Sequence, residues 1–281
     1  MAGEWLAAIV TEMGGRTMDD RTFERIGAIS AATVGLLSLL YAIAYLGITP
    51  PDQRGSDIDK FFHSYLAHPT GLRLAAVCLV LSGLVSGAAV VALVERVLRA
   101  TGREGRSPTS LTWAAVVAVV GGLATSAHGL ADLVGVDKLA HRYATGDAAA
   151  RAAVAVAHVA PSPVDPRGLA TFAAAGLVAL AVGLALRSTN PRLGVVGLVL
   201  GGDMVILFVA NAVGIPVLVL LTGGLASVIL GPIWWFGIAR LLLAGTSMPA
   251  SMPASMPASI TVDSGATTPV RTPAAPENAT A

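Results

Sequence analysis

Six apolar runs follow one another along this chain of 281 residues, and each is long enough to cross a lipid bilayer. A transmembrane helix needs ~20 mostly apolar residues. The runs cover residues 26–48, 74–94, 111–134, 168–186, 193–213 and 217–243. The sequence therefore predicts six membrane-spanning segments.

Helices are the only spans that fit these runs. A chain in contact with lipid must satisfy its own backbone hydrogen bonds, which leaves helices and closed β-barrels, and none of the runs alternates as barrel strands do. Only 12% of residues are charged and 54% are hydrophobic, whereas soluble domains carry roughly 25% charged residues. We expect an all-α, polytopic membrane protein, a bundle of six transmembrane helices.

The two ends of the chain differ in composition from the spans. We expect a cytoplasmic N-terminal segment over residues 1–22, the transmembrane domain over 23–244 and a tail over 245–281. The tail repeats Ser-Met-Pro-Ala at Ser247, Ser251 and Ser255, and this composition is typical of disorder. Residues 1–17 either lie on the membrane surface or precede the true start at Met18.

Two of the connecting segments carry helical patterns. In the first, Ser56 stands where a helix N-cap is expected, aromatic residues follow at helical spacing, and Pro69 ends the pattern. We expect a short exoplasmic amphipathic helix lying on the outer leaflet. In the second, a loop that starts at Asp137, an alanine-rich stretch over residues 147–160 predicts a similar helix.

Arginines indicate the orientation in the membrane. The short loops between spans carry an excess of Lys and Arg on the cytoplasmic side. Arginines crowd the connections after the second and fourth runs, namely Arg96, Arg99, Arg103 and Arg106 in the first and Arg187 and Arg192 in the second. We therefore expect a multi-pass protein of the cell inner membrane with both termini cytoplasmic.

Asp203 is a lone carboxylate near the middle of the fifth run. A charged side chain at the centre of a span costs at least a few kcal/mol, so Asp203 is a candidate functional residue. It either ionises in a water-filled cavity or stays protonated and fixes helix packing. Asn211 lies two turns further on nearly the same helix face and belongs to the same candidate site.

His128 and Asp132 form a second polar feature, at positions i and i+4 of the third run. This spacing puts both on one helix face, where the carboxylate can fix the imidazole tautomer or share a metal. His128 and Asp203 differ in predicted depth by ~10 Å, so a direct contact is not expected. With no Cys or paired His to complete a ligand set, no metal site and no cofactor are predicted.

Small residues predict close helix packing. Gly83 and Gly87 in the second run, and Gly197 and Gly201 in the fifth, form small-xxx-small pairs. The same pairs are candidate surfaces for a homo-oligomer or a membrane partner. A net charge of +1 gives no reason to expect nucleic acid, so the principal partner is the lipid bilayer.

Two longer motifs carry a resemblance to a known group. Leu-Arg-Ser-Thr-Asn-Pro-Arg-Leu-Gly at 186–194 and Ile-Trp-Trp-Phe-Gly from Ile233, together with the short helix after the first span, resemble uncharacterised six-helix bacterial membrane proteins, a domain-of-unknown-function group. The likeness covers roughly residues 20–243. It implies a six-helix fold and assigns no activity and no catalytic residue.

Three functions of different classes stay open from the sequence. The first, and our main expectation, is a non-enzymatic integral membrane protein with a structural or partner-interacting role. The second is a small permease or a proton-coupled sensor that uses Asp203. The third is a metal-dependent membrane enzyme of the outer half, although P-loop, Schiff-base lysine and GxSxG motifs are missing from the sequence.

Overall fold

The computed structural model describes residues 20–100, 109–160 and 162–246, and every regular element in these residues is helical. Contacts divide the chain into one unit, Met1–Ser247, and a second, Met248–Ala281, which lies outside the described residues. The prediction of an all-α fold is confirmed. The boundaries expected near residues 22 and 245, and the disorder of the tail, stay predictions.

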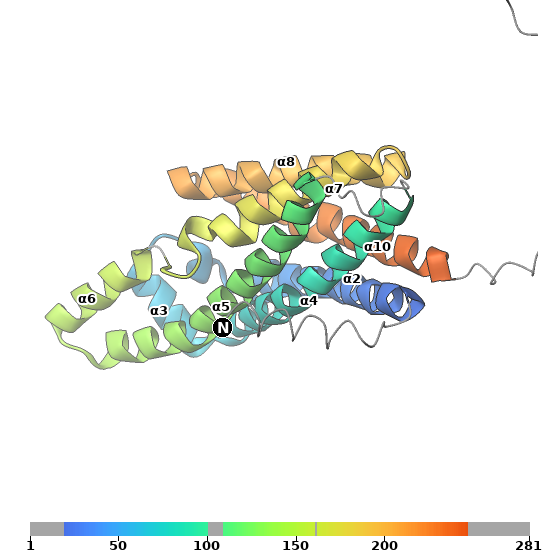
Figure 1. Ribbon diagram of the computed structural model, residues 1–281. Helices are drawn as coiled ribbons and strands as arrows, with labels where there is room; N and C mark the ends of the chain where they lie inside the picture. The colour runs from blue at the N-terminus through green and yellow to red at the C-terminus, as the bar shows by residue number, and fades with distance from the viewer. Residues whose placement is uncertain (1–19, 101–108, 161, 247–281) are drawn as a thin grey trace, which may run out of the picture. The chain divides into compact units, whose positions relative to one another are not determined.

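Six helices of the described chain are long and apolar enough to cross a membrane (Figure 1). They are α2 (Asp20–Ala42) continued by η1 (Ile43–Ile48), α4 (Thr70–Ala100), α5 (Thr109–Thr145), η4 (Leu169–Ala174) continued by α7 (Ala175–Leu186), α8 (Pro191–Val213), and α9 (Pro216–Leu225) continued by η5 (Ala226–Leu230) and α10 (Gly231–Thr246). The shorter elements are η2 (Pro51–Arg54), α3 (Ile58–Ala67), α6 (Ala148–Val159) and η3 (Pro166–Gly168). The six predicted spans are confirmed.

The spans form a closed ring in which each helix packs on the next in the chain. α2 packs on α4, α4 on α5, α5 on α7, α7 on α8, and α8 on α9 and α10, while α10 returns to α2. We call the end of the bundle that carries α3 and α6 the loop end (Figure 1), and the opposite end, where Arg96 and Arg99 lie, the arginine end. Sequential spans are antiparallel neighbours, as in other up-and-down bundles, although the two connections at the loop end are long enough to hold α3 and α6.

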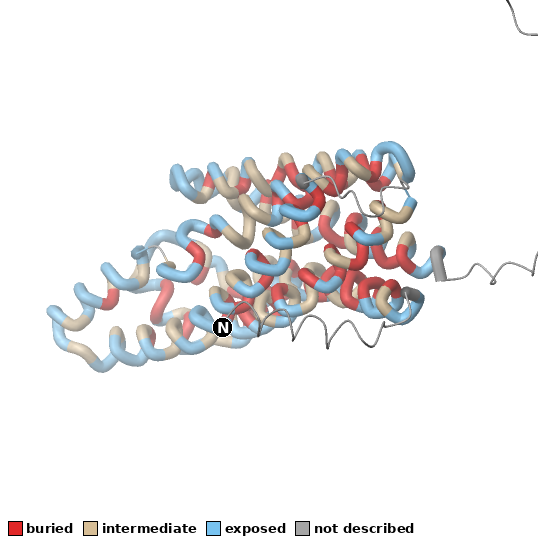
Figure 2. The backbone as a smooth tube through the Cα atoms, in the orientation of Figure 1, coloured by how far each residue is buried: buried red, intermediate tan, exposed pale blue. Residues whose placement is uncertain are grey.

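The main apolar core lies towards the arginine end. Its fully buried side chains include Leu93, Leu186, Ile238 and Leu242, which come from α4, α7 and α10. Figure 2 shows the buried residues concentrated in this part of the bundle. The loop end is less apolar, and most of the polar side chains discussed below lie there.

The four predicted packing glycines all face other helices of the same chain. A Cβ on Gly83 would meet the Gly122 carbonyl and Ser126 of α5, and one on Gly87 would lie 3.2 Å from Val119. On α8, Gly197 lies against the Trp234 ring, and a Cβ on Gly201 would lie 2.7 Å from the Gly176 carbonyl oxygen. Association with a second copy stays a prediction and would use a different surface.

The loop end is a small helical cluster rather than a helix lying on lipid. Phe61, Phe62 and Tyr65 of α3 are buried together with Ala140 of α5 and Val154 of α6. Protein, not the membrane surface, covers the apolar face of α3. The cluster exists because α5 runs on as a helix to Thr145, so the expectation of a loop from Asp137 was wrong.

The caps of the two short helices are aspartates. Asp57, not Ser56 as expected, caps α3, because its carboxylate accepts the Lys60 N–H at 3.1 Å. The same backbone hydrogen bond lowers the pKa of Asp57. Asp147 caps α6 in the same way through the Ala150 N–H at 2.9 Å, and the predicted alanine-rich helix is confirmed as Ala148–Val159.

Candidate functional site

The predicted pair of His128 and Asp132 is formed in the structure. The His128 Nε2 lies 3.5 Å from the Asp132 Oδ2, and the two side chains are 26% and 49% exposed. The Nδ1 of His128 is buried and has no hydrogen-bond partner. The carboxylate is thus held by one long contact and stays accessible. Its functional role stays a prediction.

Asp132 lines a cavity of about 90 Å³ between α2, η1, α3, α4 and α5. Three tyrosines, Tyr41, Tyr45 and Tyr65, and Arg73 line the same space, which we call the tyrosine cavity. The rings of Tyr41 and Tyr45 stack with centroids 5.8 Å apart and an interplanar angle of 6°. The cavity therefore combines aromatic rings with one cationic and one anionic side chain.

A polar network fixes Arg73 at the rim of this cavity. The Arg73 Nη2 donates to both oxygens of Asp137, at 2.6 and 2.8 Å, and the Tyr65 hydroxyl donates to the Asp137 Oδ1 at 2.7 Å. Burial, and then the hydrogen bond to Asp137, raise the pKa of Tyr65, so its phenol keeps its proton at neutral pH. The network ties α3, α4 and α5 together.

His158 of α6 lies among the aromatic rings of the loop end. Its ring centroid is 4.3 Å from that of Phe61 and 5.1 Å from that of Phe62. Burial lowers the pKa of His158, and the charge of Asp132 opposes this shift. The imidazole is therefore mainly neutral at pH 7, as a ring packed on two phenyl groups requires.

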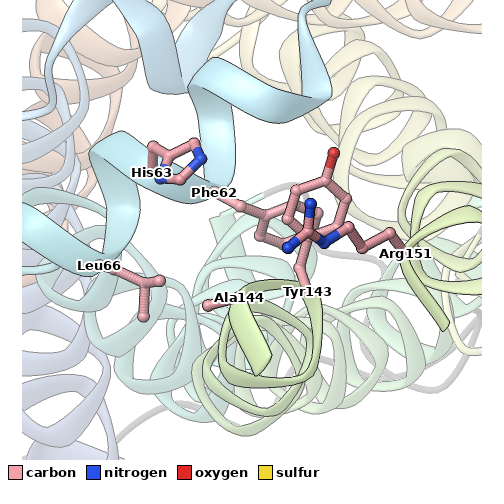
Figure 3. Close-up of a pocket in the computed structure, with 6 residues that line it drawn as sticks. All are labelled: Phe62, His63, Leu66, Tyr143, Ala144 and Arg151. Atoms are coloured by element: carbon pink, nitrogen blue, oxygen red, sulfur yellow. The ribbon is translucent and has the colours of Figure 1, made fainter. Parts of the chain in front are cut away.

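A second, smaller cavity of about 70 Å³ lies between α3, α5 and α6. Figure 3 shows its lining side chains, Phe62, His63, Leu66, Tyr143, Ala144 and Arg151, gathered between these helices. The Phe62 and Tyr143 rings stack with centroids 4.8 Å apart, and the Tyr143 hydroxyl donates to Asp59 at 3.1 Å. None of the side chains that line this smaller cavity is acidic, so its wall does not combine a carboxylate with Arg151.

Asp203 and Asn211 lie on α8 and do not line the tyrosine cavity. Asp203 is only 8% exposed, and its Oδ2 has no hydrogen-bond partner. Asn211 donates from Nδ2 to the Arg167 carbonyl at 2.8 Å. It thereby holds a turn in which Arg167 and Gly168 both have positive φ, 59° and 77°. Of the four predicted residues, the structure brings only His128 and Asp132 together, whereas Asp203 and Asn211 lie eight residues apart on α8.

Asp165 is a polar residue whose role was missed from the sequence. It is 1% exposed and accepts the N–H groups of Ala170 at 2.7 Å and Thr171 at 3.1 Å, so it caps the start of the fourth span. The Thr171 hydroxyl also lies 3.1 Å from that of Thr125 on α5. The sequence feature that could have predicted this cap is an aspartate followed by proline directly before an apolar run. Its role is structural.

Metal ligands do not gather in the part of the chain that the structure describes. No group of three or more His, Cys, Asp or Glu side chains there is close enough to hold an ion. His128 and Asp132 alone make an incomplete ligand set.

Comparison with known proteins gives one match. Residues 4–124 match the sequence model of a family described as amino acid permease, which is less than half of the chain. The matched part includes Tyr41, Tyr45, Tyr65 and Arg73, and it ends before Asp132. No curated protein and no solved structure matches the chain.

The family match and the six apolar helices both indicate a multi-pass membrane protein. The matched family is one of permeases and not the uncharacterised six-helix group that the motifs resemble.

Proposed function

We propose that the protein is a permease for a small zwitterionic solute, such as a short amino acid, with the tyrosine cavity as its binding site. The observation that carries this proposal is the presence of Arg73 and Asp132 in the wall of one aromatic cavity. A guanidinium is suited to a carboxylate, and a carboxylate to an ammonium group. The volume of about 90 Å³ suits a solute of a few heavy atoms.

Arg73 and Asp132 both retain polar atoms that can bind a ligand. The hydrogen bonds of Arg73 to Asp137 leave from Nη2, so the donors on Nη1 and Nε can serve a carboxylate. Asp132 is half exposed, and its contact with His128 is long at 3.5 Å. The faces of the Tyr41 and Tyr45 rings add an attraction for an ammonium group.

The family match supports the class of function independently of the cavity. It covers the segments that supply Tyr41, Tyr45 and Arg73. A purely structural or partner-binding protein, our main expectation from the sequence alone, has no need of a charged cavity among its spans. The permease alternative, with the tyrosine cavity in place of Asp203 as the solute site, accounts for both observations.

The arginine distribution supports an orientation for this transport. We propose that both termini and the arginine end face the cytoplasm and that the tyrosine cavity and the loop end face outwards. The cavity would then meet solute from outside the cell.

Uptake into liposomes tests the proposal. The purified full chain is reconstituted and supplied with radiolabelled glycine, alanine and serine, with tryptophan as a solute too large for the cavity. We expect uptake of at least one of the small amino acids above that of empty liposomes, and none of tryptophan. Uptake equal to that of empty liposomes for every solute would rule out the permease.

A matched pair of variants locates the site. Asp132→Asn should reduce uptake about tenfold or more, because a neutral amide replaces the carboxylate that meets the ammonium group. Asp52→Asn, an exposed aspartate of η2, should transport like the wild type. Equal rates for both variants would place the solute elsewhere in the bundle.

A further inference from the structure

Asp203 lies on a buried stripe of α8 that faces the last span. Leu200, Asp203, Leu207 and Ala210 are all buried and follow one another at helical spacing. Leu207 contacts Gly223 of α9. Nearer the start of α8, the Gly197 backbone contacts Trp234 of α10. Because the two spans are antiparallel, Asp203, between Gly197 and Leu207, lies at the depth of η5, which connects α9 to α10.

The helix opposite Asp203 is irregular and polar. η5 is a π-helical segment that contacts α8, and such segments are frequent at functional sites. The Ser227 carbonyl accepts the Ser38 hydroxyl of α2 at 3.1 Å, and the Ser227 hydroxyl donates to the Gly223 carbonyl at 2.5 Å. The buried Thr222 hydroxyl donates to Leu218 at 2.7 Å. Hydroxyl groups of α2 and of the last span therefore lie in or next to η5.

Among the residues that the structure describes, no basic side chain lies at this depth to neutralise Asp203. Of the elements that pack on α8, namely η3, η4, α7, α9, η5 and α10, only η3 and α10 contain titratable residues, Arg167 and Arg240. The carbonyl of Arg167 is bound by Asn211, eight residues or ~12 Å along α8 from Asp203. Arg240 lies thirteen residues beyond Ser227, ~20 Å towards the arginine end.

An ionised carboxylate in this position would be a buried charge without a partner. Such a charge costs several kcal/mol, and proteins avoid it by binding a proton or a cation. The unpaired Oδ2 of Asp203 is the atom at which either would bind.

We propose that Asp203 is a proton-binding site of this protein and that it couples solute movement to a proton gradient. The Oδ2 takes a proton from water to give a neutral carboxylic acid, and it returns the proton to water when the bundle opens the site to the other side of the membrane. No other bond forms or breaks. The coupling rests on the proposed permease function, whereas proton binding at Asp203 does not.

Infrared difference spectroscopy tests proton binding without any solute. The full chain in liposomes is titrated with acid and base in sodium-free buffer, and the C=O stretch of a protonated carboxyl is followed. We expect a protonated carboxyl band at pH 7 that is missing from Asp203→Asn and retained in Asp52→Asn. A spectrum of Asp203→Asn identical to that of the wild type would overturn the proposal.

A sodium titration separates a proton from a cation. If Na⁺ added at pH 7 removes the Asp203 band at physiological concentration, the site binds a metal cation in preference to a proton, and the proposal is wrong. We expect the band to be unaffected by Na⁺.

The coupling is tested in the uptake assay with an imposed pH gradient, acidic outside. We expect the gradient to increase uptake severalfold in the wild type and in Asp52→Asn, and this increase to be lost in Asp203→Asn. An equal increase in Asp203→Asn would contradict coupling through this residue. Lack of uptake in the wild type, with the infrared band present, would instead contradict the permease proposal and leave the proton site intact.

Discussion

Arg99 of α4 donates from Nη2 to the Glu24 Oε1 of α2 at a distance of 2.7 Å. Arg96, one turn earlier on α4, donates to both oxygens of the same carboxylate at 3.2 and 3.3 Å. The Glu24 side chain is only 7% exposed. Two arginines that we assigned to the cytoplasmic surface thus also bind a buried carboxylate, and this cluster joins α2 to α4 at the arginine end.

Replacing Glu24 by glutamine should destabilise the bundle. The amide cannot accept charge-assisted hydrogen bonds from both arginines, and we expect a loss of ~1–3 kcal/mol. The matched control is Glu95→Gln, because Glu95 is the exposed neighbour of Arg96 on α4. Thermal unfolding in detergent should give a clearly lower Tm for Glu24→Gln than for the control. Equal Tm values would mean that the cluster adds nothing to stability.

Replacing Gly83 by alanine should separate α4 from α5. The added Cβ would collide with the Gly122 carbonyl oxygen and Ser126, and overpacking of this kind costs ~1–3 kcal/mol. Gly135→Ala on α5 is the control, since its Cβ would meet nothing within 4 Å and alanine favours a helix interior by roughly 0.5–1 kcal/mol. Tm should fall for Gly83→Ala only. A Tm for Gly83→Ala as high as that of the control would refute close packing here.

The spans were predictable because length and apolarity decide them, and nothing in the tertiary structure competes with that signal. The loop end was predicted less well. The third span was expected to end at residue 134 where its hydropathy falls, but α5 continues to Thr145 because α3 and α6 pack against its outer part. Contacts between segments far apart in the sequence decide such boundaries, and a single sequence does not reveal them.

The candidate site was predicted in part. The spacing of His128 and Asp132 placed them correctly on one face of α5, because i and i+4 neighbours follow from helix geometry alone. Tyr41 and Tyr45, also at i and i+4, were absorbed into the first apolar run, and Arg73 lies just outside the second. Nothing in the sequence tells which helices meet, so the cavity they share with Asp132 was not predicted.

Acidification should loosen α6 through His158. Because burial lowers its pKa in the folded state, the unfolded segment binds a proton more readily, so the contribution of His158 to stability is present above its unfolded pKa of 6.5 and is lost as pH falls below it. Hydrogen exchange should give lower protection factors for α6 amides at pH 5.5 than at pH 7.5. His158→Gln should remove this difference. Wild-type protection factors for α6 that are equal at pH 5.5 and pH 7.5 would contradict this role of His158.

The orientation is tested with reporter fusions. A reporter fused after Arg106 should be active in the cytoplasm, and one fused after Arg151 should be active outside, because the arginine-rich connection is expected to stay inside. Both fusions in the same compartment would contradict the proposed topology.

Binding of a small amino acid to the purified protein tests the central claim most directly. Radiolabelled glycine, alanine and serine are equilibrated with the full chain in detergent, and bound label is measured for the wild type, Asp132→Asn and Asp52→Asn. The account predicts saturable binding by the wild type and Asp52→Asn, with affinity for the same amino acid about tenfold or more weaker in Asp132→Asn. Wild-type binding that is absent, or that is unchanged by Asp132→Asn, would contradict the assignment of the tyrosine cavity as the solute site.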